Sequence, residues 1–261
     1  MHRWRGDAEQ ALGILVERHT EAVKSAAPQS TPAALGLSSR VGGWHSGCVR
    51  ISHLGHACVL VQTDGARILI DPGVFSDAWH ELTGLDAVLV THQHPDHIDP
   101  AHVFPLLAAN PGARVLVEPT TVEMFPTDLP AAAFSAGQST SIGDVSVTGV
   151  GGEHAMIHPE LPRVGNVGLV LRSEGEPTLF HPGDSYSVVP DDADVLAVPI
   201  NAPWAKLRET VDFVRAVAAG HWFPIHDALL SPVGRSLYTA RVAELSPGDL
   251  LNLDEEGSAA L

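Results

Sequence analysis

The chain has very little cysteine and few aromatic residues for its length. Its 261 residues include two cysteines, Cys48 and Cys58, and aromatic residues make up 5%. A fold stapled by disulfides needs more cysteine than this, so a hydrophobic core must hold the chain together. Hydrophobic residues make up 44%, which suffices for one large domain. We therefore expect both cysteines to be reduced thiols.

Long apolar runs are also missing. No segment approaches the roughly twenty apolar residues that a helix needs to cross a bilayer. The first residues, Met1 to Asp7, lack the apolar core of a secretory signal. The sequence therefore predicts a cytoplasmic protein that does not associate with membranes.

Positive charge is scarce. The chain has 15 Lys and Arg against 31 Asp and Glu, a formal net charge of −16. Nucleic-acid binding needs a basic face, which this balance disfavours. We expect a small-molecule substrate and no nucleic-acid partner, and self-association into a homo-oligomer remains open.

Metal-binding side chains are abundant in one short segment. The motif His92-Gln93-His94-Pro95-Asp96-His97 follows the apolar run Ala87 to Val90, which is typical of a buried strand. Three imidazoles and a carboxylate supply nitrogen and oxygen donors that suit zinc, manganese or iron better than calcium or magnesium. The motif therefore predicts a transition-metal site on the loop after the strand.

Four further candidate residues each follow an apolar run of their own: Asp71, His154, Asp184 and His226. A lone histidine is usually a structural residue that satisfies its own hydrogen bonds. Beside a four-donor motif, their recurrence at strand ends favours one shared site.

These motifs resemble those of the metallo-β-lactamase fold superfamily, whose signature His-X-His-X-Asp-His stands here at 92–97. The segments Ile51 to Ala57 and Ile68 to Gly73 are similar to its opening strands, and Phe180 to Ser185 is similar to its later Gly-Asp motif. The chain is most similar to the branch of ascorbate-6-phosphate lactonase-like and uncharacterised metal-dependent hydrolases. The resemblance extends from about Val49 to Leu253.

The resemblance implies an α+β fold, the four-layer αββα sandwich of the metallo-β-lactamase type. Residues 49–261 would form this hydrolase domain. Residues 1–48 lie before it and read as an N-terminal helix over 7–26 and a linker rich in Pro and Ser.

The resemblance also implies a ligand set. His92, His94 and His154 would hold one divalent ion. Asp96, His97 and His226 would hold a second, and Asp184 would bridge the two. Zinc is the expected metal, with manganese and iron as alternatives.

Two such ions would share a bridging hydroxide for attack on a small ester, lactone or phosphorylated metabolite. Asp96 and Asp184 would then be catalytic as well as ligating. Three alternatives stay open: a phosphodiesterase of the same superfamily, a mononuclear iron oxygenase, and a metal-binding protein without catalysis.

Several nearby residues are weaker candidates for supporting roles. Asp71 would accept an imidazole N–H, although an Asp-Pro-Gly turn explains it nearly as well. The others would contact substrate, donate a proton or line the pocket, with ordinary packing as the alternative for each: His53, His56, His181, Tyr186 and Trp204.

The local pattern predicts an antiparallel meander from Arg50 to Asp71, with a hairpin at Thr63-Asp64-Gly65 that uses positive φ angles. It also predicts helices over 99–109 and 206–219.

Overall fold

The computed structural model describes residues 49–127, 131–253 and 257–261. The helix predicted over 7–26, the linker after it and Cys48 lie outside these ranges. Within them, no helix has the length and apolar character needed to cross a membrane. Cys58 is buried and is not part of a disulfide.

Among the described residues, the first sheet has the strand order β14-β1-β2-β3-β4-β5-β6. The predicted meander is present as three antiparallel strands, and β3 to β6 run parallel. The strands are β1 (Arg50–Gly55), β2 (Cys58–Gln62), β3 (Arg67–Ile70), β4 (Ala87–Val90), β5 (Arg114–Val117), β6 (Ala132–Ala133) and β14 (Ala259–Ala260).

The second sheet has the order β13-β12-β11-β10-β9-β8-β7. Strands β7 to β10 pair antiparallel, and strands β10 to β13 pair parallel. The strands are β7 (Ser139–Ile142), β8 (Val145–Glu153), β9 (Gly165–Arg172), β10 (Leu179–His181), β11 (Val195–Pro199), β12 (His221–Ile225) and β13 (Asp249–Leu250).

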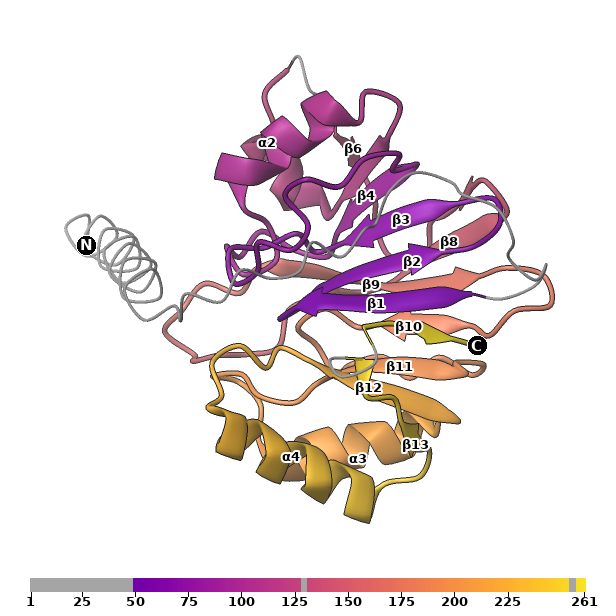
Figure 1. Cartoon of the computed structure of the whole chain (residues 1–261). Helices are drawn as coiled ribbons and strands as arrows, with labels where there is room; N and C mark the ends of the chain where they lie inside the picture. The colour runs from indigo at the N-terminus through magenta and orange to yellow at the C-terminus, as the bar shows by residue number, and fades with distance from the viewer. Residues whose placement is uncertain (1–48, 128–130, 254–256) are drawn as a thin grey trace, which may run out of the picture. The chain divides into compact units, whose positions relative to one another are not determined.

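Helices cover the outer faces of both sheets (Figure 1). Helix α2 (Pro100–Ala109) and the 3₁₀ turn η1 (Pro119–Met124) lie beside the first sheet. Helices α3 (Leu207–Val217) and α4 (Pro232–Leu245) lie beside the second. The layers therefore run αββα, which confirms the predicted fold class.

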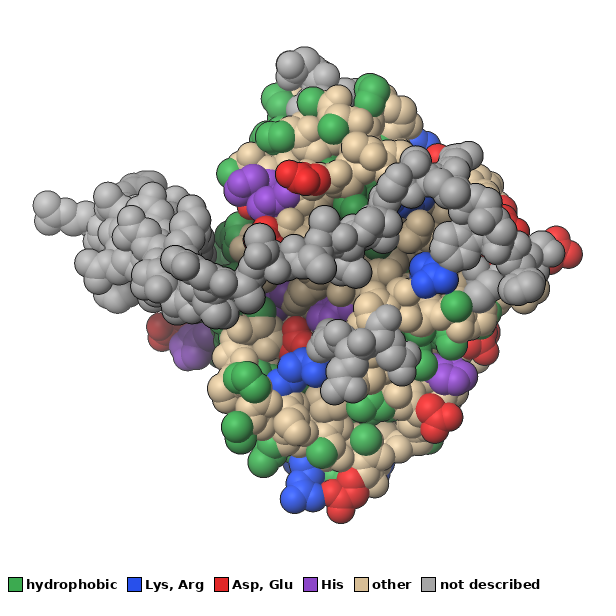
Figure 2. Space-filling view, viewed as in Figure 1, with side chains coloured by type: hydrophobic (Ala, Val, Ile, Leu, Met, Phe, Trp, Pro, Cys, Tyr) green, Lys and Arg blue, Asp and Glu red, His purple; other side chains and the backbone are tan. Residues whose placement is uncertain are grey.

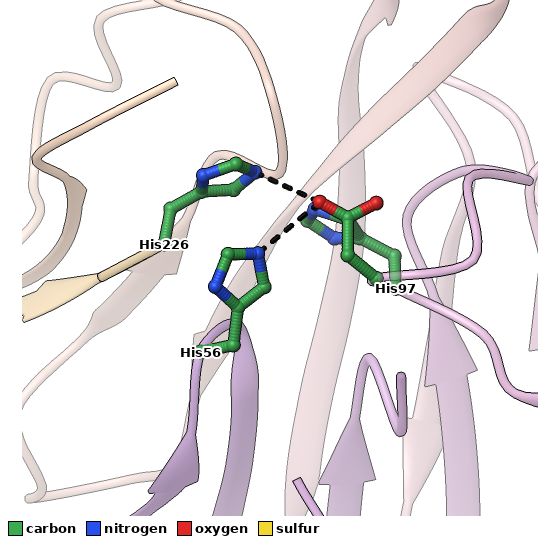
Figure 3. A group of neighbouring side chains, drawn as sticks. His56, His97 and His226 are labelled. Carbon is green, nitrogen blue, oxygen red and sulfur yellow. Dashed lines mark hydrogen bonds and ion pairs between the residues drawn. The ribbon is translucent and has the colours of Figure 1, made fainter. Parts of the chain in front are cut away.

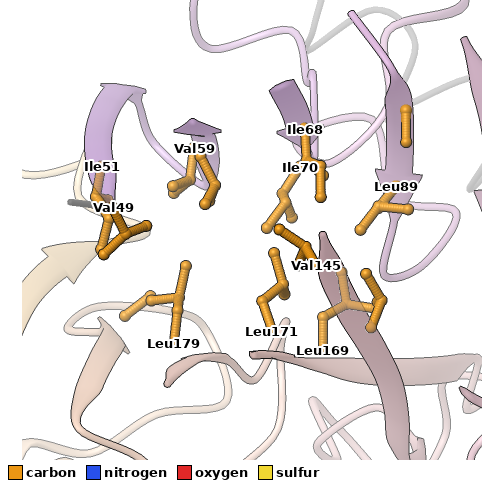
Figure 4. Close-up of a cluster of buried hydrophobic side chains, with 14 of the residues drawn as sticks. Val49, Ile51, Val59, Ile68, Ile70, Leu89, Val145, Leu169, Leu171 and Leu179 are labelled. Atoms are coloured by element: carbon orange, nitrogen blue, oxygen red, sulfur yellow. The ribbon is translucent and has the colours of Figure 1, made fainter. Parts of the chain in front are cut away.

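Three hydrophobic clusters hold the four layers together. The largest lies between the sheets, where Ile51, Ile70 and Leu89 face Leu169 and Leu171 (Figure 4). Alternate residues of β3 and β4 point the other way, into a second cluster under α2. A third cluster joins β10 and β11 to α3. Central parallel strands are thus buried on both faces, which explains their continuous apolar sequences.

The hairpin between β2 and β3 forms at the predicted place but not with the predicted geometry. Neither Asp64 nor Gly65 has a positive φ. Instead, the hydroxyl of Thr63 accepts hydrogen bonds from the amides of Gly65 and Ala66 and donates to Asp144. The threonine side chain supplies the turn's hydrogen bonds, so the prediction of positive φ was wrong.

Candidate metal centre

The predicted donor residues lie at the carboxyl ends of strands from both sheets. The motif at 92–97 follows β4 of the first sheet. His154 follows β8, Asp184 follows β10 and His226 directly follows β12, all in the second sheet. Because the sheets pack face to face, these strand ends meet at one edge of the sandwich. Figure 2 shows histidine and acidic side chains side by side near the middle of one face.

One group of donors consists of His92, His94 and His154. A nitrogen from each ring lies within 4.8 Å of the other two. His92 and His154 are buried and His94 is half-buried. Three imidazoles in this arrangement form one face of a tetrahedral metal site.

A second group consists of Asp96, His97, His226 and His56, whose donor atoms also lie within 4.8 Å of one another. The carboxylate of Asp96 is 3.2 Å from His226 Nε2 and 3.1 Å from His56 Nε2 (Figure 3). The first three of these residues are the predicted second ligand set, and His56 lies beside them against the Asp96 carboxylate.

Asp184 lies between the two groups. Its Oδ1 is 3.1 Å from His97 Nε2, while its Oδ2 is 3.3 Å from His154 Nε2 and 3.1 Å from His226 Nε2. The side chain is almost fully buried. One carboxylate therefore faces donors from both groups at once.

The hydrogen bonds around these rings leave their Nε2 atoms available for a metal. His154 Nδ1 donates to the carbonyl of Ala155 and His226 Nδ1 donates to the carbonyl of Asn201, each at 2.6 Å. His97 Nδ1 donates to Asp71. The Nε2 atoms of all three histidines are buried, make no well-directed hydrogen bond, and face Asp184 oxygens at 3.1–3.3 Å. Buried polar atoms normally make well-directed hydrogen bonds, so nitrogens that converge with carboxylate oxygens in this way fit divalent cations.

Asp71 anchors the loop that carries the motif. Its Oδ1 accepts from the amide of Thr91 and its Oδ2 accepts from the hydroxyl of Thr91 and from His97 Nδ1, each at 2.7 Å. The Thr91 hydroxyl in turn lies 3.1 Å from His92 Nδ1. This network sets the tautomers of two donor histidines.

Backbone strain is concentrated at this centre. Four non-glycine residues of the described ranges have positive φ angles, and three of them are His56, Asp71 and His226. Gly73 is also required, because a Cβ there would meet the carbonyl oxygen of Asp96 at 1.9 Å. Such conformations cost stability and persist where they position functional side chains.

The two donor groups differ in protonation when no metal is bound. Burial lowers the pKa of His94 to about 4, and it also lowers the pKa of His92 well below its ordinary value. Burial acts in the same direction on His226, but the Asp184 carboxylate outweighs it and raises the pKa to about 10. The pKa of His97 is likewise raised, against burial, by Asp184 and Asp71. Without metal, His92 and His94 are therefore neutral, whereas His97 and His226 are paired with the Asp184 carboxylate.

We expect the metal-free domain to be most stable near the ordinary histidine pKa of 6.5. The raised pKa of His226, about 10, contributes stability that is lost as the pH rises from about 6.5 to 10. The lowered pKa of His94, about 4, makes stability fall as the pH drops from 6.5 toward 4. Thermal unfolding of chelated protein across this range measures both slopes. A midpoint that rises steadily from pH 6.5 to 10 contradicts the assignment.

His53 and His181 are held within the fold. His53 Nε2 donates to the carbonyl of His56. His181 is fully buried, donates from Nε2 to the carbonyl of Ala57, and accepts at Nδ1 from the amide of Gly183. His181 thus braces the turn before Asp184 and has no surface that a substrate could contact.

Tyr186 and Trp204 pack against each other, with ring centroids 4.8 Å apart. The Tyr186 hydroxyl donates to the carbonyl of Pro199 and lies 2.9 Å from the Thr210 hydroxyl. Trp204 Nε1 donates to Asp184 Oδ2 at 2.9 Å. Trp204 therefore contacts the centre, whereas the Tyr186 hydroxyl is engaged inside the fold.

Two supporting residues were underrated or missed in the sequence. His56 Nδ1 accepts from the amide of Ala228, so its Nε2 carries a proton and donates to Asp96. Asn166 accepts from the amide of Asp184 and donates to the carbonyl of Pro182. In the sequence, His56 was marked by a Gly-His turn between two strands, and Asn166 by its position as an asparagine inside the apolar strand β9.

A sandwich of two mixed sheets between helices, with histidine and aspartate donors at the strand ends, defines a metallohydrolase fold of the metallo-β-lactamase type. Residues 50–226 match the family model of the β-lactamase superfamily domain. The chain therefore belongs to the metallo-β-lactamase superfamily, in the branch of uncharacterised metal-dependent hydrolases.

This chain aligns with most of the length of two relatives. Protein Rv0786c of Mycobacterium tuberculosis is 41% identical over 211 residues, which cover 80% of this chain and 99% of that protein. A UPF0173 protein of Pyrococcus furiosus is 32% identical over 187 residues, covering 68% and 83%.

A solved structure shares the fold at low sequence identity. The metallo-β-lactamase fold protein YhfI from Bacillus subtilis superposes with a TM-score of 0.62 at 18% identity, covering 79% of this chain and 96% of that one. The similarity extends over nearly the whole of that protein, so its two-sheet architecture is the one that β1 to β14 form here.

Proposed function

We propose that this protein is a hydrolase that uses two divalent metal ions to cleave a small ester or lactone. The observation that carries the proposal is the position of Asp184, whose two oxygens face nitrogen donors from both groups. A carboxylate so placed suits a pair of ions better than one ion. Membership of a branch of metal-dependent hydrolases supports hydrolysis as the reaction.

The residues fall into two ligand sets. His92, His94 and His154 would hold one ion, and Asp96, His97 and His226 would hold the other. Five imidazoles among these six donors favour zinc, with manganese and iron as weaker candidates. The chemistry that such ions supply when bound is a water with a pKa lowered toward about 7 and a polarised substrate oxygen.

The rest of the site keeps the donors in position. Asp71 holds the proton of His97 on Nδ1, so Nε2 presents its lone pair to the centre. His56 donates to Asp96 Oδ2, the oxygen that also lies 3.2 Å from His226 Nε2, and so holds that carboxylate toward the centre. Trp204 donates to Asp184 Oδ2 and holds the second carboxylate in the same way. Hydrogen bonds of this kind orient ligands and raise their basicity.

Removal of metal should abolish hydrolysis. We expect elemental analysis of untagged protein to find about two zinc ions per chain, because the donors form two sets. Dialysis against a chelator should eliminate turnover of simple esters and lactones, and two equivalents of zinc should restore it. Magnesium, which prefers oxygen ligands, is the control that should not. Full turnover in metal-free protein, or a single iron with oxygen-dependent activity, contradicts the proposal.

A further inference from the structure

Apolar side chains are exposed on the connection between β8 and β9. This segment, residues 154–164, begins at the donor His154 and returns to the second sheet at β9. Met156 is 57% exposed, Leu161 51% and Ile157 38%. Single exposed apolar residues are ordinary, but three within six positions form a patch, and such patches mark binding surfaces.

The patch and the metal centre share one cavity. A cavity of about 130 Å³ is lined by Met156, Ile157 and Leu161 and also by His94 and His154. Two predicted metal ligands and the exposed apolar residues therefore line the same cavity. A substrate whose reacting carbonyl lies at the centre would place its neighbouring atoms against this patch.

Apart from any metal ions that the donor residues hold, the described lining of the cavity has one permanent cation that could receive a phosphate or carboxylate group. Among the described residues that line it, Arg163 is the one with a permanent positive charge. Its Nε donates to the carbonyl of His154 at 2.7 Å, and its guanidinium is 2.9 Å from the Glu153 carboxylate. Phosphate and carboxylate recognition usually relies on an available arginine or lysine. A guanidinium already engaged by a carboxylate and a carbonyl is a poor anion receptor.

We infer that the site takes an uncharged ester or lactone whose aliphatic chain lies on Met156, Ile157 and Leu161, and that it discriminates against phosphorylated or carboxylated substrates. The inference rests on the proposed function and specifies its substrate class. In the reaction, water adds to the acyl carbon, the bond from that carbon to the ester oxygen breaks, and the alcohol leaves with a proton. The cavity is smaller than a typical drug-sized pocket, so a short chain fits it.

A series of umbelliferyl esters tests this inference on zinc-loaded full-length protein. The acyl group runs from acetyl through butanoyl to hexanoyl, and the hemisuccinate ester adds a charged end to a chain of similar length. We expect kcat/KM to rise about tenfold or more from acetyl to hexanoyl, since each buried methylene adds binding energy. The hemisuccinate should react at least about tenfold more slowly than the butanoyl ester because its carboxylate would lose hydration without gaining a partner.

Variants of the patch residues test whether the patch causes the preference for longer acyl chains. Met156→Ser and Leu161→Ser should lower the ratio of hexanoyl to acetyl kcat/KM toward one. Both side chains are exposed, so a serine there should not unfold the domain. Val233→Ser on α4, where the valine is 79% exposed, is the matched control and should leave the ratio unchanged.

The outcomes separate this inference from the function on which it rests. Zinc-dependent cleavage with no chain-length preference, or with a preference for the hemisuccinate, overturns the inference and leaves the hydrolase proposal standing. Failure to cleave any ester or lactone removes the hydrolase proposal. Calorimetric titration with the uncharged amides hexanamide and acetamide then tests the chain site alone. Tighter binding of hexanamide, lost in Leu161→Ser, supports the inference, and equal binding overturns it.

Discussion

Replacing Asp184 with asparagine should lower turnover about 100- to 1,000-fold while the domain stays folded. Asparagine keeps the shape of the side chain but removes the charge that faces His97, His154 and His226. It also presents an amide NH₂, in place of a carboxylate oxygen, to the buried Nε2 nitrogens of these histidines. We expect the metal content to fall from two ions per chain to one or none, measured by elemental analysis beside steady-state kinetics.

Asp192→Asn is the matched control for this prediction. Asp192 is an exposed aspartate that pairs with Arg172 at the surface, so its replacement should change neither metal content nor turnover. Circular dichroism and thermal unfolding show whether each variant remains folded. Wild-type kcat with a full complement of metal in the Asp184 variant contradicts the bridging role.

Replacing Asp71 with asparagine should weaken metal affinity about 10- to 100-fold although Asp71 would not itself hold a metal. The carboxylate accepts the Nδ1 proton of His97, whereas an asparagine amide there would donate to Nδ1 instead. His97 would then carry its proton on Nε2 and lose the lone pair that it presents to the centre. Competition with a chromogenic zinc chelator measures the loss.

Asp71 is also a buried charge with three hydrogen bonds, so Asp71→Ala should cost stability as well. We expect Asp71→Ala to lower the free energy of unfolding by about 3–5 kcal/mol, the range for breaking a buried pair. Asp86→Asn serves as the control, because Asp86 accepts a backbone amide at the other end of β4 and does not contact the centre. Unchanged zinc affinity in Asp71→Asn would show that Asp71 stabilises its Asp-Pro-Gly turn and does not orient His97.

The αββα architecture places this chemistry at one edge because of strand direction. Strands β4, β10 and β12 are all members of parallel pairs, and the chain leaves each of them at its carboxyl end. Loops at these ends therefore gather side chains from distant parts of the sequence. The sheets behind them are packed on both faces and give the loops a rigid base.

Much of the first sheet and of α3 was predictable from the sequence, because the spacing of apolar residues and the Gly and Pro residues between segments mark these elements locally. Helix α4 was not predicted. Its exposed face carries Val233 and Leu237, so its apolar residues do not follow one helical stripe. Strand β7 was also missed, since its Ser-Thr-Ser sequence pairs with β8 as a half-exposed edge.

The supporting residues were harder to read than the donors. His56, His53 and His181 looked equivalent in the sequence, each a histidine near a turn. The structure separates them by the partner at Nε2, which is the Asp96 carboxylate for His56 and a backbone carbonyl for the other two. A hydrogen-bond partner is a tertiary property, and no spacing in the sequence encodes it.

The sequence by itself pointed to the candidate donor residues and, through the family resemblance, to the fold class. Histidines and aspartates follow apolar strands, and strand loops are where such donors can converge. The family resemblance implied the two groups and the place of Asp184 between them. Only the tertiary structure decided the contacts by which the donors converge and that Met156, Ile157 and Leu161 border the same cavity. The physical reason is that periodicity reports which face of a strand is buried, whereas the packing of the two sheets decides which strand ends meet.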